Sequence, residues 1–182
     1  MSPDDAAALG ACIAAGGVAV FPADTVYGLA CDPGNADAIG RLYALKGRAP
    51  DKPSATMYFD LESVPGVGAR TDAAVRRLLP GGVTLILPGG LGVRVPFFAP
   101  VGRAILQSSA NFSGGPDARR LEDVPAEIRD AADLVIDGGE LPGTPSTVID
   151  LRAYETTGDW SILREGAVPP ATVAAKIKGQ TP

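Results

Sequence analysis

The stretch VAVFPADTVYGLA, residues 18–30, decides the fold that this sequence predicts. Its first four residues are apolar and predict a short buried strand that ends at Pro22. Residues 22–30 are expected to form an irregular loop running into a second strand. Apolar side chains recur at helical spacing on both sides of this stretch, which predicts helices over 4–15 and 37–45.

The rest of the chain continues this mixture of strands and helices. Further strands are predicted over residues 54–59, 83–87, 92–95, 104–107, 134–136, 147–151 and 160–163. One helix is expected from Thr71, as its N-cap, through Leu79, and two more within 121–131 and over 170–178. Strands and helices alternate early and strands dominate late. This order predicts an α/β fold with one open, twisted, mixed sheet and helices packed on it.

The bulk properties suit one folded domain. The chain has 182 residues and shows no linker, so a single domain is expected over 1–182, with its motifs within 18–166. Its formal net charge is −5, which argues against a general affinity for nucleic acids. No basic leader and no apolar run of roughly 20 residues is visible, so we expect a cytoplasmic protein without membrane contact.

The sequence contains no histidine, which removes several kinds of chemistry. Ser-His-Asp and Cys-His catalysis are excluded, as are zinc sites rich in histidine. The two cysteines, Cys12 and Cys31, form no CxxC pair and predict buried free thiols. Any reaction must therefore use lysine, arginine, carboxylates, hydroxyls, backbone groups or a borrowed cation.

A local cluster of cations stands out against the acidic composition. Lys46, Arg48 and Lys52 fall within seven positions, where Gly47 lets the backbone approach a ligand closely. Arginine's planar fork matches phosphate or carboxylate oxygens, and lysine adds a compact charge. The alternative is a solvated helix C-terminus, where cations suit the helix dipole.

The segment SSANFSG, residues 108–114, follows a predicted strand end. Ligands in open α/β sheets bind beyond the carboxyl ends of strands. The hydroxyl of Ser109, the amide of Asn111 and a glycine-rich backbone offer neutral hydrogen-bond donors to an anion. An ordinary Ser/Asn turn is the alternative.

Thr25 is placed in the same way, just after a short strand. Its hydroxyl can orient a polar ligand, and Tyr27 can supply a flat wall, unless Tyr27 belongs to the core. Asp24 could assist a metal or an amine, although an exposed loop aspartate is the simpler interpretation.

Three more polar residues stand at predicted strand ends. Arg94, flanked by valines, faces either the surface or a buried carboxylate, and Ser146 and Arg164 add two possible contacts with an anion. Cations and hydroxyls without histidine or a carboxylate pair fit phosphoryl or nucleotidyl transfer, which relies on positioning and charge. The sequence lacks the usual phosphate-binding motifs GxxxxGK[ST] and GxGxxG.

In order, the motifs PADTVYGL, KGRAPDKP, GVRVP, SSANFSG, STVID and LREG span residues 22–166. Together they resemble the YrdC-type threonylcarbamoyl-AMP synthase family. The resemblance implies a twisted α/β sheet around a deep basic cavity. It also implies synthesis of threonylcarbamoyl-AMP and pyrophosphate from L-threonine, bicarbonate and ATP, with Mg²⁺ carried by ATP and no direct protein ligand. The product would pass to a transferase complex that makes N6-threonylcarbamoyladenosine in tRNA.

The resemblance also implies roles for individual residues. Lys46 and Arg48 would be catalytic and, with Ser109 and Asn111, would surround the ATP phosphates. Two further positions match nucleotide contacts and three match threonine contacts; these are Lys52 and Arg164, and Thr25, Arg94 and Ser146. The chain departs from the usual motifs at Ala23, Met57, Gly90 and Asp117.

Three alternative functions remain open. One is a carbamoyl-adenylate-forming module like that of hydrogenase-maturation carbamoyltransferases, although the extra regions of those chains are absent. Another is a module that binds double-stranded RNA or tRNA without catalysis, which the acidic charge and the few aromatic residues disfavour. The third is a relative that binds a nucleotide without turnover.

Overall fold

The computed structural model describes residues 1–49, 54–98 and 101–180, and within them nine strands form one mixed sheet. The strands are β1 (Ala19–Ala23), β2 (Val26–Cys31), β3 (Ala55–Met57), β4 (Val83–Ile86), β5 (Gly92–Arg94), β6 (Ile105–Ser109), β7 (Leu134–Val135), β8 (Thr147–Asp150) and β9 (Ser161–Arg164). Their spatial order is β7-β1-β2-β6-β3-β5-β4-β8-β9. The predicted α/β class and mixed sheet are confirmed.

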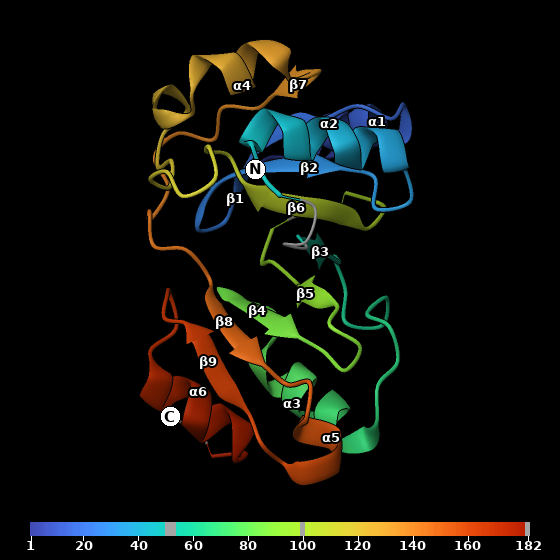
Figure 1. Ribbon diagram of the computed structural model, residues 1–182, viewed down its shortest axis with the longest axis vertical. Helices are drawn as coiled ribbons and strands as arrows, with labels where there is room; N and C mark the ends of the chain where they lie inside the picture. Colours follow the sequence, from blue (N-terminus) through green and yellow to red (C-terminus); the bar gives the residue numbers. More distant parts are fainter. Residues whose placement is uncertain (50–53, 99–100, 181–182) are drawn as a thin grey trace.

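The helices lie at both ends of this sheet (Figure 1). They are α1 (Pro3–Ala14), α2 (Ala36–Lys46), α3 (Ala69–Leu78), α4 (Ala126–Ala131), α5 (Tyr154–Thr157) and α6 (Pro170–Ile177), with a 3₁₀ turn, η1, at Leu121–Asp123. In the upper half of the figure, α1, α2 and α4 surround β1, β2 and β6, while α3, α5 and α6 lie below with β4, β8 and β9. None of the helices described has the length and apolar character needed to cross a membrane.

Helices cover both faces of the strands at the first end of the sheet. Along β1, Val20 packs into the cluster that contains Leu42 of α2 and Ile128 of α4, whereas its neighbour Phe21 packs with Leu9 of α1. This alternation follows from the two-residue period of a strand. It explains why the segment around β1 is a nearly continuous apolar run rather than an alternating one.

The other end of the sheet is covered differently. Leu85 of β4 and Ile149 of β8 belong to a core cluster with residues of α3 and α6. The residues next to them, Thr84 and Val148, point to the opposite face and line a cavity. One face of this end therefore forms a core, and the other contributes to a polar hollow.

Local sequence signals fix the two ends of α2. Asn35 caps the start, because its Oδ1 accepts a hydrogen bond from the Ala38 N–H at 3.0 Å. Gly47 ends the helix in the left-handed conformation, with φ +58°. Glycine adopts this conformation without the strain that a Cβ would add. The helix thus delivers Lys46 in its last turn and turns the chain sharply before Arg48.

Two predicted boundaries near β1 are wrong. The strand continues through Pro22 to Ala23, and β2 begins at Val26, so the expected irregular loop shrinks to Asp24-Thr25. Pro22 pairs with Tyr27, but the Tyr27 carbonyl accepts from the Ala110 N–H at 2.8 Å and the Tyr27 N–H donates to Ala118 O at 2.9 Å. The missing N–H of Pro22 therefore removes no hydrogen bond from this pair.

The predicted N-cap of α3 is also wrong. The helix begins at Ala69, and Thr71 lies within its first turn. Both the backbone N–H and the hydroxyl of Thr71 donate to Glu155 Oε2 at 2.8 Å. Glu155 belongs to α5, a short helix that the sequence pattern did not predict, so α3 receives its capping acceptor from a distant element.

Candidate active site

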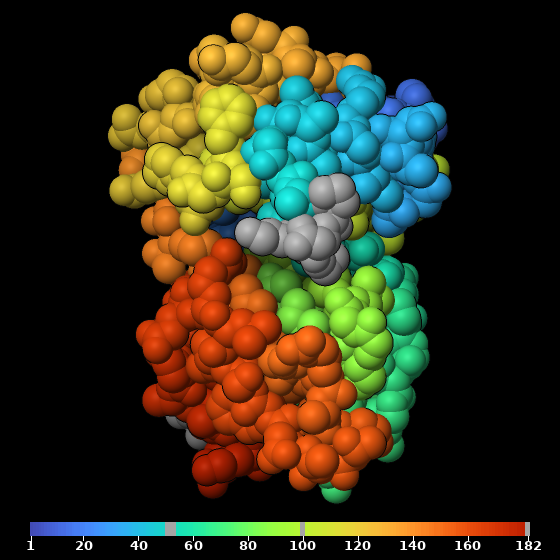
Figure 2. All heavy atoms as spheres, in the orientation of Figure 1, coloured from blue at the N-terminus to red at the C-terminus, as the bar shows by residue number. Residues whose placement is uncertain are grey.

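A cavity of about 260 Å³ lies over the central strands. Six of the nine predicted site residues line it: Thr25, Arg48, Arg94, Ser109, Ser146 and Arg164. Lys46 and Asn111 lie behind this wall, in direct contact with Ser109, while Lys52 falls outside the described residues. Residues spread over 140 positions of sequence are thus collected in one place. The space-filling view shows the cyan residues of α2 and the yellow residues around 110–120 above the green and orange residues of the lower half (Figure 2).

Lys46 is one of the most deeply buried side chains of the protein, with 2% of its surface exposed. Its Nζ donates to Ser109 O at 2.5 Å and to Asn111 O and Oδ1 at 2.8 Å, and lies 3.4 Å from Ser109 Oγ. An ammonium group has three hydrogens, and the three short contacts use all of them. In this structure Lys46 therefore braces the turn at 109–111 instead of reaching into the cavity.

Asn111 completes this brace. Its Oδ1 accepts from Ser109 Oγ at 2.7 Å, and its Nδ2 donates to Gly115 O at 2.8 Å and to Pro116 O at 3.0 Å. The Ser113 N–H in turn donates to Lys46 O at 2.8 Å. The two buried side chains fix the loop after β6, and this loop places Ser109 and Asp117 on the cavity wall.

The charge of Lys46 is affected by its surroundings. Burial and then the nearby Arg48 lower the pKa of Lys46 from its usual range to about 8, while Asp117 acts in the opposite direction. Removing a charged group from water disfavours the charged form, which explains the main effect. The site thus holds an ammonium that can lose its proton at mildly alkaline pH.

Arg94, the last residue of β5, is the buried cation of the cavity. Only 3% of it is exposed, and its Nη2 donates to Asp24 Oδ1 at 2.5 Å. Its Nε is buried and has no hydrogen-bond partner among the residues that the structure describes. Arg94 also lines the cavity, so its guanidinium offers positive charge and hydrogen-bond donors to a ligand oxygen there.

The pair of Arg94 with Asp24 settles two alternatives. Arg94 faces a carboxylate rather than the surface, and Asp24 is not an exposed loop residue, since 16% of its side chain is exposed. Burial raises the pKa of Asp24, while Arg94 opposes this shift. Beside them, the Thr25 hydroxyl donates to Ala23 O at 3.3 Å and lines the cavity.

A second polar group comes from β4, from β9 and from Ser146, the residue just before β8. The hydroxyls of Thr84 and Ser146 are 2.7 Å apart. Arg164 donates from Nη2 to Ser146 O at 2.8 Å and from Nε to the same oxygen at 3.3 Å. Arg164 thus anchors the backbone that carries Ser146, and both remain on the cavity wall.

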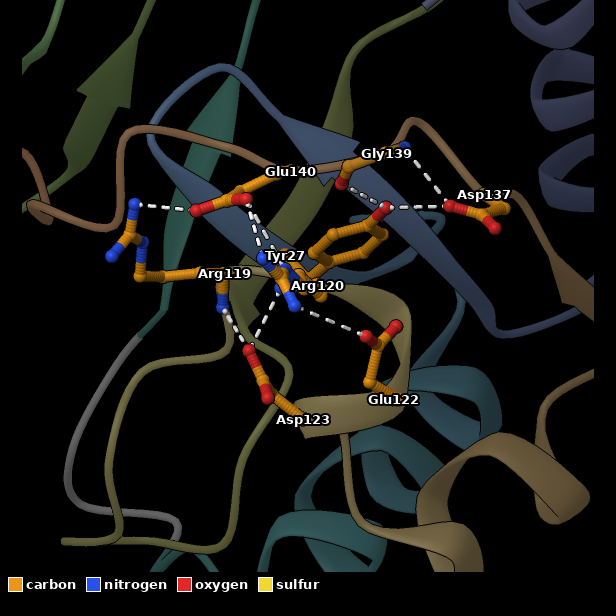
Figure 3. Close-up of polar contacts among 8 residues, drawn as sticks. All are labelled: Tyr27, Arg119, Arg120, Glu122, Asp123, Asp137, Gly139 and Glu140. Atoms are coloured by element: carbon orange, nitrogen blue, oxygen red, sulfur yellow. Dashed lines mark hydrogen bonds and ion pairs between the residues drawn. The ribbon is translucent and has the colours of Figure 1, made fainter.

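Tyr27 does not form a wall of the site. It is completely buried, and its hydroxyl donates to Gly139 O at 2.9 Å, lies 3.1 Å from Asp137 Oδ1 and accepts from the Gly138 N–H at 2.9 Å. Figure 3 shows this hydroxyl at one end of a polar cluster, where Arg119 and Arg120 converge on Glu140. Tyr27 therefore fastens the segment between β7 and β8, as the core alternative expected.

Sequence reasoning did not single out Thr84, Gln107 and Ser108, which also line the cavity, and it treated Asp117 as a departure from a motif. The sequence does contain a signal for Thr84, because it is the one hydroxyl residue within the otherwise apolar run 83–87. Among the described lining residues the cavity holds three arginines and one aspartate. The expectation of a deep, basic cavity stays a prediction. No group of three histidine, cysteine, aspartate or glutamate residues within the described chain could hold a metal ion.

Comparison with known proteins identifies the family to which the chain belongs. The Sua5/YciO/YrdC family model, which carries the description "Telomere recombination", matches residues 11–166. This chain belongs to the Sua5/YciO/YrdC family. The match covers every described site residue, from Thr25 to Arg164.

Members of this family with similar sequences carry a consistent name. The chain is 33% identical to a threonylcarbamoyl-AMP synthase from Chromohalobacter salexigens over 78% of its own length and 89% of that protein. It is 30% identical to a threonylcarbamoyl-AMP synthase from Pyrococcus abyssi over 85% of its own length and 52% of that protein. It therefore spans about half the length of the Pyrococcus relative and of a Bacillus subtilis relative, of which it covers 53%.

A solved structure of this family shows the same fold. The crystal structure of P. abyssi Sua5 complexed with L-threonine superposes with a TM-score of 0.84 at 28% identity, over 99% of this chain and 59% of that one. The agreement covers the complete sheet of the present chain.

Proposed function

We propose that this protein is an L-threonylcarbamoyladenylate synthase, which forms threonylcarbamoyl-AMP and pyrophosphate from L-threonine, bicarbonate and ATP. The observation that carries the proposal is Arg94: an arginine with 3% of its surface exposed, which lines a polar cavity and is held by Asp24. Such a group suits the carboxylate of an amino acid. The naming of several relatives and the threonine complex of P. abyssi Sua5 support the same assignment.

We assign the two substrates to adjoining sides of this one cavity. Thr25, Arg94 and Ser146 form the proposed threonine side, where Ser146 is held by Thr84 and Arg164. Arg48, Ser109 and Arg164 form the proposed ATP side, with Lys46 and Asn111 supporting the wall from behind. Lys52 remains a proposed ATP contact on the basis of its motif alone.

The reaction needs charge control more than a strong base. The threonine amine attacks the carbon of bicarbonate, with loss of water, or of carbon dioxide, with loss of a proton from the amine, and gives a carbamate. A carbamate oxygen then attacks the α-phosphorus of ATP, and the bond to pyrophosphate breaks. Arg48 and Arg164 would lower the repulsion between these anions, and preorganised cations of this kind are a major source of catalysis.

Mg²⁺ would enter with ATP. Asp117 is the one acidic side chain among the described lining residues, which is too few to hold a bare cation in place. When bound with ATP, the ion would neutralise the charge that develops on the departing pyrophosphate. The chain's own arginines would orient the remaining phosphate oxygens.

We further propose that the product passes to the transferase complex that modifies tRNA, and that any contact with tRNA is weak.

The test of the enzymatic proposal is pyrophosphate release with ATP, Mg²⁺, L-threonine and bicarbonate. Release that needs both L-threonine and bicarbonate supports it. Release that needs carbamoyl phosphate instead would favour the carbamoyl-adenylate alternative, and salt-sensitive RNA binding without any release would favour the RNA-binding alternative.

A further inference from the structure

The turn between β1 and β2 has an unusual backbone. It consists of Asp24 and Thr25, and Asp24 has a φ of +56°, the only positive φ of a non-glycine residue in the described chain. The Thr25 N–H donates to Ala23 O at 2.6 Å, across Asp24 alone. A turn closed over one residue with positive φ is strained.

Glycine or asparagine would fit this backbone at least as well as aspartate. The feature that distinguishes Asp24 is its carboxylate, which the turn carries to Arg94 Nη2. Within the described residues this carboxylate is the only hydrogen-bond partner of the Arg94 guanidinium. The strained turn therefore brings an acceptor to a buried cation that otherwise has none.

A guanidinium is planar, so one bonded edge restricts the direction of the others. Asp24 holds Nη2, and the Arg94 side chain lines the cavity. We propose that Asp24 is a positioning residue: it fixes the Arg94 guanidinium at the cavity wall so that the group meets the carboxylate of the amino-acid substrate. This inference rests on the proposed function, since it assigns the residue that orients the proposed threonine contact.

The alternative explanation is that Asp24 acts through its charge or that the turn matters by itself. Three variants separate these effects. Asp24→Asn keeps an acceptor oxygen and tolerates positive φ but loses the charge. Asp24→Gly removes the side chain and relieves the backbone, and Asp24→Ala removes the side chain and keeps the strain.

The experiment measures pyrophosphate release for the full chain, with KM for L-threonine and for ATP determined separately. Circular dichroism and binding of a non-hydrolysable ATP analogue establish that each variant is folded. We expect Asp24→Gly and Asp24→Ala to raise the KM for L-threonine by about tenfold or more, with the KM for ATP changed by less than about twofold. Asp24→Asn should restore the KM for L-threonine to within about threefold of the wild type.

Equal threonine KM values in the wild type and Asp24→Gly would overturn the positioning role. So would a defect in Asp24→Ala that Asp24→Gly lacks, because that result would assign the effect to the turn. A defect in Asp24→Asn as large as in Asp24→Gly would assign it to charge and overturn the inference too. A wild-type protein without threonine-dependent release would contradict the proposed function itself, which distinguishes the two failures.

Discussion

Lys46 and Arg48 stand two positions apart but belong to different environments. Lys46 supports the 109–111 turn from behind, whereas Arg48 lines the cavity. Each replacement by alanine is expected to lower kcat/KM for ATP by more than about tenfold. Lys46→Ala should also lower the free energy of unfolding by more than Arg48→Ala, because it leaves buried oxygens without a donor. Urea denaturation beside steady-state kinetics checks this, and normal turnover in both variants would contradict the assignment.

The pKa of Lys46 predicts a pH dependence at the same scale. Its ammonium is charged below a pKa of about 8 and loses its proton above it, since burial disfavours the charged form. Because the positive charge is lost, kcat/KM for ATP should fall as the pH rises through about 8. The free energy of unfolding should not fall with it, because a lowered pKa means that the folded state favours the neutral amine. Lys46→Arg keeps its charge in this range, so if it retains activity it should lack the alkaline fall. A wild-type profile that is flat up to pH values well above 8 would refute the prediction.

At the scale of elements, helix α2 connects local backbone geometry to the site. Gly47 ends the helix with φ +58°, and a Cβ built there would meet no atom within 4 Å. Gly47→Ala should thus destabilise the protein through strain alone, by about 1–2 kcal/mol. Because Gly47 sets the direction of Arg48, the Gly47→Ala variant should also show a higher KM for ATP. Gly47→Asn tolerates this conformation better and is the matched control; equal losses in the two variants would argue against a conformational cause.

Strands and helices with clear periodicity could be predicted from the sequence, and so could the mixed sheet. The end of β1 could not, because Pro22 is compatible with the sheet only where its pair needs no N–H. The cap of α3 comes from Glu155, which lies far along the chain, so no local pattern announces it.

In the candidate site, too, some features could be predicted from the sequence and others could not. The ordered motifs singled out Thr25, Arg94, Ser146 and Arg164, and the structure places these four residues around one cavity. A buried carboxylate is one of the two partners that the sequence predicts for Arg94, but its identity as Asp24 cannot be predicted, because it depends on how two distant strands meet. The inward direction of Lys46 likewise follows from tertiary packing against the 109–111 turn.

At the scale of the whole molecule, the segment that links β7 to β8 joins the two ends of the sheet. Tyr27 holds this segment through Gly139 (Figure 3) and Gly138. The Gly143 N–H also donates to Thr25 O at 2.9 Å. Tyr27→Phe should lower the free energy of unfolding by about 0.5–1.5 kcal/mol, because it removes the hydrogen bonds that tie Gly138 and Gly139 to the buried ring. Catalytic constants at low temperature should change little. A variant as stable as the wild type in denaturant titrations would show that this link contributes nothing.

One measurement tests the central claim most directly. The full chain is incubated with ATP, Mg²⁺, L-threonine and bicarbonate, and pyrophosphate is measured as each component is omitted in turn. Omission of L-threonine or of bicarbonate should abolish release, and Arg94→Lys should raise the KM for L-threonine because a lysine lacks the planar fork. Pyrophosphate release at the same rate without L-threonine would contradict the assignment.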